Sequence, residues 1–128
     1  KVGAEFNATW NVDRVGGYEK AFCCFNATAR DYARVGQALM SGDPKIASTS
    51  WKARLSTSAV KLDYGWGYGA QMWHPYPGIN LMMGLHGQYI YMDALHDTVI
   101  VKLSDMPTSS DGISAKIAPV LREIAEKN

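Results

Sequence analysis

Two stretches before residue 60 have apolar residues at helical spacing. The first has a mostly apolar face made of Ala29, Tyr32, Ala33, Val35 and Leu39. Thr28 can cap this helix, and Asp31 stands three residues later, where a capping box has its acidic residue. The breaker at residues 41–44 ends it. A second, short helix is predicted to begin at Ser48 or Ser50 and to reach Leu55.

The period of the pattern changes from about four to two after Leu62. Trp66, Tyr68, Ala70 and Met72 alternate with glycine and glutamine, which predicts a strand. After the breaker at 74–78, a second strand with internal glycines is predicted through 81–92. The chain then turns at 94–97, and a third strand returns over 98–103. Because the links are short, these strands are predicted to be antiparallel.

A terminal helix is predicted after the strands. Ser110 and Asp111 can cap it, and its apolar side holds Ile113, Ile117, Leu121 and Ile124. Pro119 falls inside this pattern, so we expect it to kink the helix or to mark its true first turn.

The predicted order is two helices, about three antiparallel strands and one helix, which is an α+β arrangement in one domain over residues 1–128. Residues 1–20 carry only isolated apolar points and are expected to form an irregular arm. A three-stranded sheet with one helix packed on it leaves its other face uncovered. The strands carry many large apolar side chains, so we expect another part of a larger protein to pack there.

Composition and charge exclude several classes of function. The 128 residues include 13 basic and 12 acidic side chains, for a net charge of +1, and no Lys/Arg-rich run. Binding to nucleic acid or to a membrane surface is therefore not indicated. No apolar stretch approaches the length of a membrane span. The N-terminus has neither an initiator Met nor a signal-peptide pattern, so we expect the chain to start inside a longer protein or to be trimmed.

The two cysteines, Cys23 and Cys24, are adjacent. A bridge between neighbours needs an unusual geometry, so we expect reduced thiols buried as small apolar groups. Reduced cysteines are typical of a cytoplasmic protein. His74, His86 and His96 fall in three different β or turn elements, without a carboxylate at ligand spacing. We therefore predict neither a metal site nor a cofactor, and we expect His96 to be solvated.

Two motifs resemble the serine hydrolases of the β-lactamase and penicillin-binding-protein superfamily. Residues 25–36, Phe-Asn-Ala-Thr-Ala-Arg-Asp-Tyr-Ala-Arg-Val-Gly, resemble a helix start of that family. Residues 84–93, Gly-Leu-His-Gly-Gln-Tyr-Ile-Tyr-Met-Asp, resemble the hairpin before its last strand and helix. Within the superfamily, the Gly-Gln-Tyr-Ile-Tyr run is similar to that of the 6-aminohexanoate-dimer (nylon-oligomer) hydrolases and related esterases. The likeness extends from Glu19 onward and implies a partial β-lactamase-like fold, the C-terminal portion of a larger hydrolase.

The resemblance also implies a chemistry and a site. In this family a serine of a Ser-x-x-Lys turn attacks a carbonyl and forms an acyl-enzyme, while backbone N–H groups hold the oxyanion. The alignment places Met82, Met83 and Gly84 at the family's Lys-Thr-Gly or His-x-Gly element, without its cation. This absence argues against β-lactam hydrolysis and favours a small ester or amide substrate. Leu85 would supply an oxyanion N–H from its backbone, and Met82, Met83, Gly84 and His86 would contact the substrate.

The nucleophile of such an enzyme is not evident in this chain. Ser58 and Lys61 match Ser-x-x-Lys, but they lie after the helices and just before the first strand, whereas the family has its copy far upstream. No Tyr-x-Asn occurs. We therefore expect the N-terminal portion of the hydrolase, a separate chain or a missing segment, to carry the nucleophile. Two alternatives remain: a non-catalytic binding module derived from the same fold, and a minimal enzyme built on Ser58 and Lys61.

Overall fold

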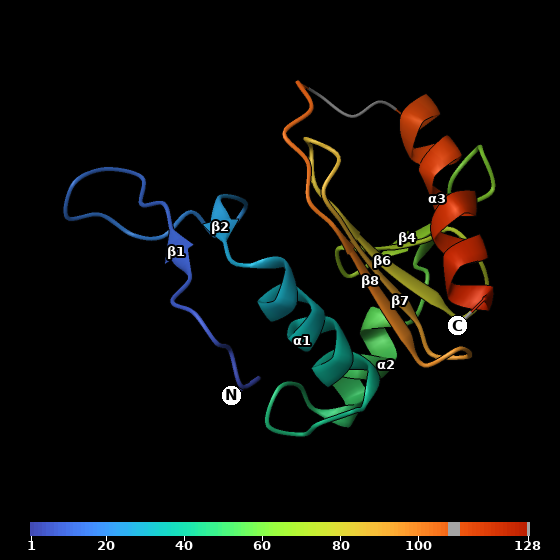
Figure 1. The fold of residues 1–128 in the computed structure, drawn as a ribbon, viewed down its shortest axis with the longest axis horizontal. Helices are drawn as coiled ribbons and strands as arrows, with labels where there is room; N and C mark the ends of the chain where they lie inside the picture. Colours follow the sequence, from blue (N-terminus) through green and yellow to red (C-terminus); the bar gives the residue numbers. More distant parts are fainter. Residues whose placement is uncertain (108–110, 128) are drawn as a thin grey trace.

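The computed structural model describes residues 1–107 and 111–127, and it confirms the α+β class. The helices are α1 (Ala29–Met40), α2 (Thr49–Leu55) and α3 (Asp111–Glu126), and they lie on both sides of a sheet (Figure 1). Thr28 and Ser48 cap α1 and α2 as predicted, each accepting a hydrogen bond from the third following N–H. The predicted capping residue Ser110 lies outside the described residues. Because α3 begins at Asp111, Pro119 does not mark its first turn.

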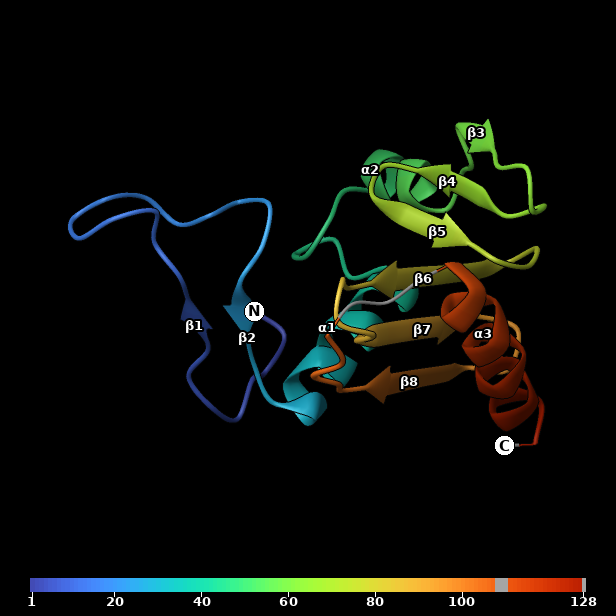
Figure 2. The same ribbon diagram turned by 90° about the horizontal axis from the view of Figure 1, so that it is seen from above.

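The main sheet is larger than predicted. Within the described residues it has six antiparallel strands in sequential order: β3 (Val60–Lys61), β4 (Gly67–Gly69), β5 (Met72–His74), β6 (Ile79–Met83), β7 (Tyr89–Asp93) and β8 (Thr98–Lys102). Figure 2 shows this meander from β3 to β8. β8 confirms the third predicted strand, whereas the two-residue β3 was not predicted from the sequence.

The strand predicted over 66–72 is a hairpin of β4 and β5. Gly69 pairs with Met72, so Ala70 and Gln71 alone make the turn. Both have positive φ, 47° and 65°, which is the conformation that a two-residue hairpin turn of type I′ requires. Glycine, asparagine and aspartate usually occupy such positions. The sequence Ala-Gln gave no turn signal, so the alternating pattern continued through the turn.

The strand predicted over 81–92 is also two strands, β6 and β7. Their register pairs Met83 with Tyr89, and residues 84–88 connect them as a loop. Gly87 has a φ of 76°, which favours glycine, and the Gly84 N–H donates to the Gln88 carbonyl at 2.8 Å. The internal glycines therefore mark a turn rather than a weak point in one strand.

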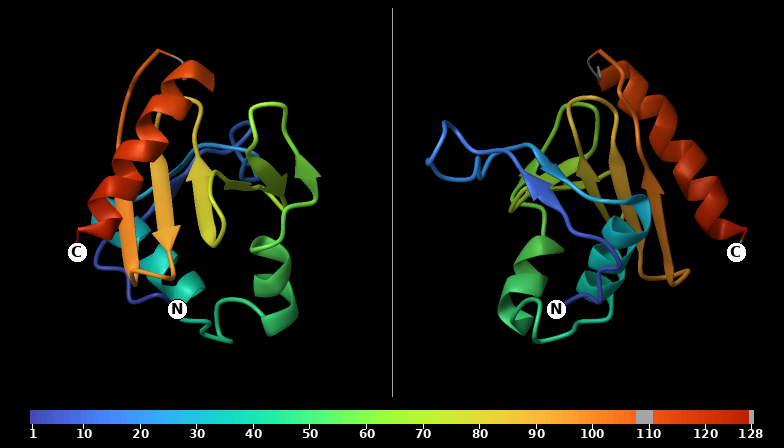
Figure 3. Two further views of the ribbon diagram at one scale, coloured as in Figure 1. Left: turned by 90° about the vertical axis from the view of Figure 1, so that its right-hand side faces the viewer. Right: turned by 60° about the vertical axis from the view of Figure 1, so that its left-hand side comes forward.

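Both faces of the sheet are covered, which contradicts the expectation of one uncovered face. On one face, Leu121 and Ala125 of α3 pack on a buried cluster of Ile79, Leu81, Tyr89 and Tyr91. On the opposite face, side chains of α1 and α2 pack on Met72, Ile90 and Met92. The right-hand view of Figure 3 shows the strands between these two helical layers. The strand aromatics Tyr89 and Tyr91 are therefore core residues of this chain, and the partly buried Trp66 and Trp73 pack against the same cluster.

Residues 1–27, here called the N-terminal arm, leave the body and return to it (Figures 1 and 2). Within the arm, β1 (Thr9–Trp10) pairs with β2 (Phe25–Asn26). Asp31 at the start of α1 holds the beginning of the arm, because its carboxylate accepts from the N–H groups of Glu5 (2.8 Å) and Phe6 (3.3 Å). The Glu5 N–H lowers the pKa of Asp31 most, with further contributions from Thr28 and Arg34.

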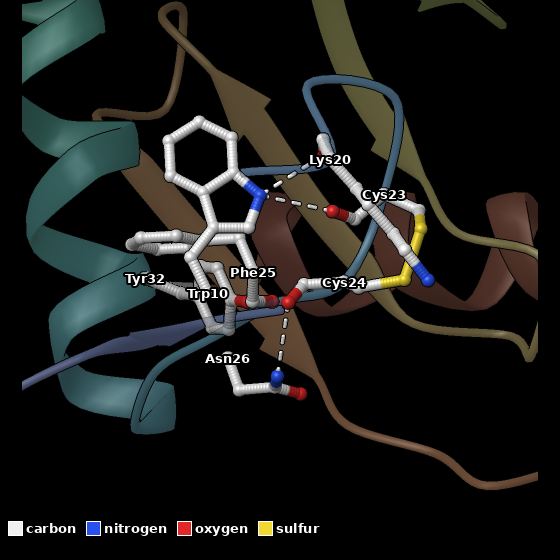
Figure 4. The surroundings of a disulfide bond; sticks show 7 residues. All are labelled: Trp10, Lys20, Cys23, Cys24, Phe25, Asn26 and Tyr32. Atoms are coloured by element: carbon white, nitrogen blue, oxygen red, sulfur yellow. Dashed lines mark hydrogen bonds between the residues drawn. A yellow bond between two sulfur atoms is a disulfide. The ribbon is translucent and has the colours of Figure 1, made fainter. Parts of the chain in front are cut away.

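The arm corrects the prediction for the cysteines. Cys23 and Cys24 are bonded to each other, and both are half-buried rather than buried (Figure 4). The observation that favoured a cytoplasmic location is thereby removed. The large apolar side chains that the arm exposes include Phe6, Trp10, Val15, Tyr18, Phe22 and Phe25.

α1 approaches the sheet at Gly36, which is buried. A Cβ at this position would lie 2.7 Å from Cγ1 of Val99 and 3.3 Å from Cγ2 of Ile90. In a helix, Ala normally stabilises by about 1 kcal/mol relative to Gly, but overpacking a core costs about 1–3 kcal/mol. We expect Gly36→Ala to lower the free energy of unfolding by about 1 kcal/mol in urea denaturation. The exposed neighbour Gln37→Ala is the control and should be nearly neutral; a Gly36→Ala protein more stable than wild type would contradict this packing.

Candidate functional site

The candidate site is the loop of residues 84–88, which connects β6 to β7 at one end of the sheet (Figure 1). Three of its N–H groups are satisfied within the loop. Gly84 donates to the Gln88 carbonyl (2.8 Å), Gly87 donates to the Gly84 carbonyl (3.0 Å), and His86 donates to the Gln88 side-chain oxygen Oε1 (3.1 Å). The Leu85 N–H has no acceptor among the described residues, and Leu85 is 66% exposed. The Leu85 N–H is therefore an available backbone donor of this loop.

Two side-chain contacts fix the loop to β8 and to the segment that follows β8. Lys102, at the end of β8, donates from Nζ to the Gly87 carbonyl at 2.8 Å and lies over the ring of Tyr89. His86 Nδ1 lies 2.7 Å from the Met106 carbonyl and 3.0 Å from the Pro107 carbonyl. Because carbonyl oxygens only accept, Nδ1 must carry the proton. A neutral His86 then has its Nε2 lone pair free to accept.

The space beside Gly84 is taken up by the side chain of Gln88. A Cβ on Gly84 would lie 2.6 Å from Oε1 of Gln88 and 3.4 Å from its Cβ. The Gln88 amide thus occupies the space beside Gly84, and the same oxygen accepts from the His86 N–H. A side chain at position 84 would therefore require the Gln88 amide to shift.

The structure separates the two methionines of the predicted site. Met82 packs toward Met72, Ile90 and Met92 on the face covered by α1 and α2. Met83 packs toward the opposite cluster, under α3. Because side chains alternate along a strand, the two cannot line the same wall of a pocket. Gly84, Leu85 and His86 do lie together in the loop.

The structure also gives the positions of Ser58 and Lys61, which match the Ser-x-x-Lys motif in sequence. Ser58 lies between α2 and β3, and its hydroxyl donates to the Val60 carbonyl at 2.7 Å. Lys61 is in β3, at the outer end of the sheet. Between them the chain bends at Ala59 before it enters β3, and none of residues 58–61 is helical. Ser58 and Lys61 therefore lack the shared helical face that a Ser-x-x-Lys pair uses.

The other histidines have local structural contacts. His74 Nδ1 lies 3.2 Å from the Ile79 carbonyl. His96 is not merely solvated, because its Nδ1 lies 2.8 Å from the carboxylate of the buried Asp93. Across residues 1–107 and 111–127, no three His, Cys, Asp or Glu side chains are grouped as metal ligands. In the same residues, no helix is both long and apolar enough to cross a bilayer.

Sequence reasoning missed two residues that shape the loop, Gln88 and Lys102. Gln88 stands in the run that resembles the hydrolase family, but nothing local indicates that its side chain folds back on the loop. Lys102 reads as an ordinary polar residue at the end of a strand. Its contact with Gly87 spans 15 positions and depends on the pairing of β7 with β8.

Two hollows of the described surface lie away from the loop. A hollow between the helices and the sheet is lined by Leu39, Met40, Lys52, Leu55, Ser56, Met72, Asn80 and Met92. A second one lies beside the N-terminus and α1. Neither has a residue of the 84–88 loop in its described lining. The Leu85 donor thus lies outside both of these hollows.

Comparison with known proteins gives a likeness to a hydrolase. No model of a protein family matches the chain. The 6-aminohexanoate-dimer hydrolase of Paenarthrobacter ureafaciens is 31% identical over 123 residues, which cover 84% of this chain. The match covers 31% of that hydrolase, so the chain spans about a third of the length of this relative. The chain is therefore similar to part of a known hydrolase.

Proposed function

We propose that this chain is the C-terminal portion of a serine hydrolase that cleaves an ester or a linear amide through an acyl-enzyme. The observation that carries the proposal is the unpaired N–H of Leu85, in a loop where the N–H groups of Gly84, His86 and Gly87 have acceptors and Lys102 anchors the Gly87 carbonyl. Similarity to a hydrolase over 84% of the chain supports it. An unsatisfied, fixed backbone donor is the feature that an oxyanion hole requires.

In the proposed mechanism, the carbonyl oxygen of the substrate accepts from the Leu85 N–H. When the serine of the N-terminal portion attacks, negative charge develops on that oxygen and the hydrogen bond strengthens. Lys102 and Gln88 keep the donor in place without contacting the substrate. Gly84 gives Gln88 its space, and His86 offers Nε2 beside the reacting carbonyl.

The proposed substrate class follows from the residues at positions 82–84, next to the Leu85 donor. Met82 and Met83 precede Gly84, so no cation stands where penicillin-recognising relatives meet the substrate carboxylate. We therefore propose a small ester or amide without a β-lactam ring. Because the two methionines face opposite ways, only one of them can contact that substrate.

The proposed partner is the N-terminal portion of the same hydrolase, which would supply the serine, lysine and tyrosine. The relative is about three times as long as the matched region, which leaves room for such a portion. Within this chain, the arm exposes Tyr18 (81%) and Phe22 (85%) along with other large apolar residues. We propose that the N-terminal portion covers this part of the arm.

A chimera tests the proposal. In the Paenarthrobacter hydrolase, the region that matches this chain is replaced by residues 1–128, and hydrolysis of p-nitrophenyl esters and of the 6-aminohexanoate dimer is measured. We expect turnover of at least one substrate, and none in the same hydrolase truncated before the matched region. A folded chimera with no activity on either substrate class would contradict the proposal.

The alternative is a binding module that kept the sheet and lost the chemistry. The placement of Ser58 and Lys61 agrees with it as well as with the hydrolase proposal, since neither requires a nucleophile in this chain. A Ser-x-x-Lys motif encoded in frame upstream of Lys1 would exclude this alternative. An inactive, folded chimera would support it.

The isolated chain is expected to associate. Its arm exposes several large apolar side chains, with Phe22 and Tyr18 almost fully accessible, and exposed apolar groups favour association. We expect light scattering to show mass that rises with concentration, and a dye for apolar surfaces to bind. Replacing Tyr18 and Phe22 by Ser should reduce both signals, whereas Leu95→Ser, an equally exposed position in the turn before β8, is the control. A dilution-insensitive monomer that binds no dye would contradict this expectation.

A further inference from the structure

We propose that the Cys23–Cys24 disulfide is a redox-sensitive latch that keeps the N-terminal arm folded against α1. Both cysteines are half-buried in an arm that projects from the body, so a reductant can reach the bond (Figure 1). A dithiol reductant supplies two electrons and two protons. It becomes a disulfide while Cys23 and Cys24 become two thiols. This latch is independent of the proposed hydrolase activity.

The bond acts on the backbone conformation of Cys24. Cys24 has a φ of 71°, in the left-handed region that residues other than glycine seldom adopt. A bond between adjacent side chains closes a small ring that includes the peptide between them, and this ring restricts the backbone. When the ring opens, Cys24 is free to return to the conformations that an L-residue prefers.

The carbonyls of the two cysteines organise the arm around them. The Cys24 carbonyl accepts from the Asn11 N–H and from the Asn26 side-chain amide, both at 3.1 Å. The Cys23 carbonyl accepts from the indole N–H of Trp10 at 3.0 Å. Figure 4 shows the indole nitrogen of Trp10 facing the carbonyls of Lys20 and Cys23. A rotation at Cys24 would therefore break the contacts that join the two strands of the arm.

Trp10 connects this part of the arm to α1 through a chain of aromatic contacts. Its ring meets Phe25 edge to face, with centroids 5.6 Å apart, and Phe25 meets Tyr32 of α1 in the same way at 6.2 Å. The Tyr32 hydroxyl also donates to the Phe25 carbonyl at 2.6 Å. The anchor of Glu5 and Phe6 on Asp31 includes neither cysteine. Reduction should thus release residues 9–26 and leave the start of the arm attached.

Hydrogen exchange with and without dithiothreitol tests the latch in the 128-residue chain. Thiol alkylation followed by mass spectrometry reports the redox state. On reduction, we expect the Asn11 and Lys20 amides to exchange about tenfold faster or more, because both are bonded within the arm. Amides of β7 should keep their protection. Alkylation without reductant, unchanged exchange after reduction, or loss of protection in β7 would each overturn the proposal.

Two double variants separate the bond from the backbone conformation that it holds. Cys23→Ser with Cys24→Ser should exchange like the reduced protein under both conditions. Cys23→Ser with Cys24→Gly should regain part of the protection without any disulfide, because glycine adopts positive φ readily. Neither should respond to dithiothreitol. A serine pair as protected as the oxidised protein, or a glycine variant no better than the serine pair, would overturn the proposal.

Discussion

A chimera with Leu85→Pro is expected to lose about a hundredfold to a thousandfold in turnover, whereas Leu85→Ala should retain almost all of it. Proline removes the backbone N–H, and alanine keeps it. Loss of one oxyanion donor has an effect of this size. The Leu85 side chain is exposed, so its truncation removes little packing.

The proline variant tests the donor without an obvious structural penalty. The Leu85 N–H has no acceptor within the described residues, so its removal breaks no hydrogen bond of the fold there. The preceding residue is Gly84, which tolerates the restricted conformations before proline. Circular dichroism and thermal unfolding should therefore match those of Leu85→Ala. Full turnover in both variants, with both folded, would mean that the loop is not the oxyanion wall.

Gly84→Val in the same chimera should disturb the loop that positions the Leu85 N–H. We expect it to lower turnover by roughly a hundredfold, the effect of losing one oxyanion donor. Its Cβ would displace the Gln88 amide, and the N–H of His86 would then lose its acceptor. Gln88→Ala is the matched comparison, since it frees the same N–H without crowding. If both variants reduce turnover with little change in KM, the loop is acting in the transition state rather than in substrate binding.

The helices were predictable because their signals are local. Thr28 and Ser48 cap the helices that the sequence indicated, and the apolar face of α1 packs on the sheet. The strand boundaries were harder to predict. When the turn residues of a hairpin are not the usual ones, the alternation of apolar and polar residues continues through the turn. Ala70 and Gln71 adopt positive φ without being glycine or asparagine. The pairing of β4 with β5 stabilises this turn. The free energy of that pairing depends on the tertiary structure, so the local sequence pattern does not indicate it.

The candidate site was predictable only in part. The resemblance to hydrolases indicated Gly84, Leu85 and His86, and these do lie in one loop. The residues that hold the loop act over distance: Lys102 reaches it from β8, and His86 reaches the carbonyls of residues 106 and 107. The prediction for Met82 and Met83 treated neighbours in sequence as neighbours in space. Alternation along β6 places them on opposite faces of the sheet.

The state of the cysteines also depends on residues distant in the sequence. Adjacent cysteines were expected to be reduced because a bridge between neighbours restricts the backbone. The arm provides the required conformation at Cys24, and the indole of Trp10 and the Asn11 amide bind the carbonyls that result. These partners come from a strand more than ten positions away, so the sequence around Cys23 and Cys24 did not indicate them.

The isolated chain is expected to hydrolyse p-nitrophenyl esters no faster than its Ser58→Ala variant, and at least about a thousandfold more slowly than the active chimera. Ser58 donates its proton to the Val60 carbonyl, and Lys61 lies on an extended strand rather than on a shared helical face. A serine without a base loses most of its nucleophilic advantage. Parallel assays of the wild-type chain, Ser58→Ala and Lys61→Ala give the test, with circular dichroism to confirm that each is folded. Turnover by the wild-type chain that disappears in both variants would establish Ser58 as a nucleophile and Lys61 as its base. The donor at Leu85 would then serve a site that this chain completes by itself.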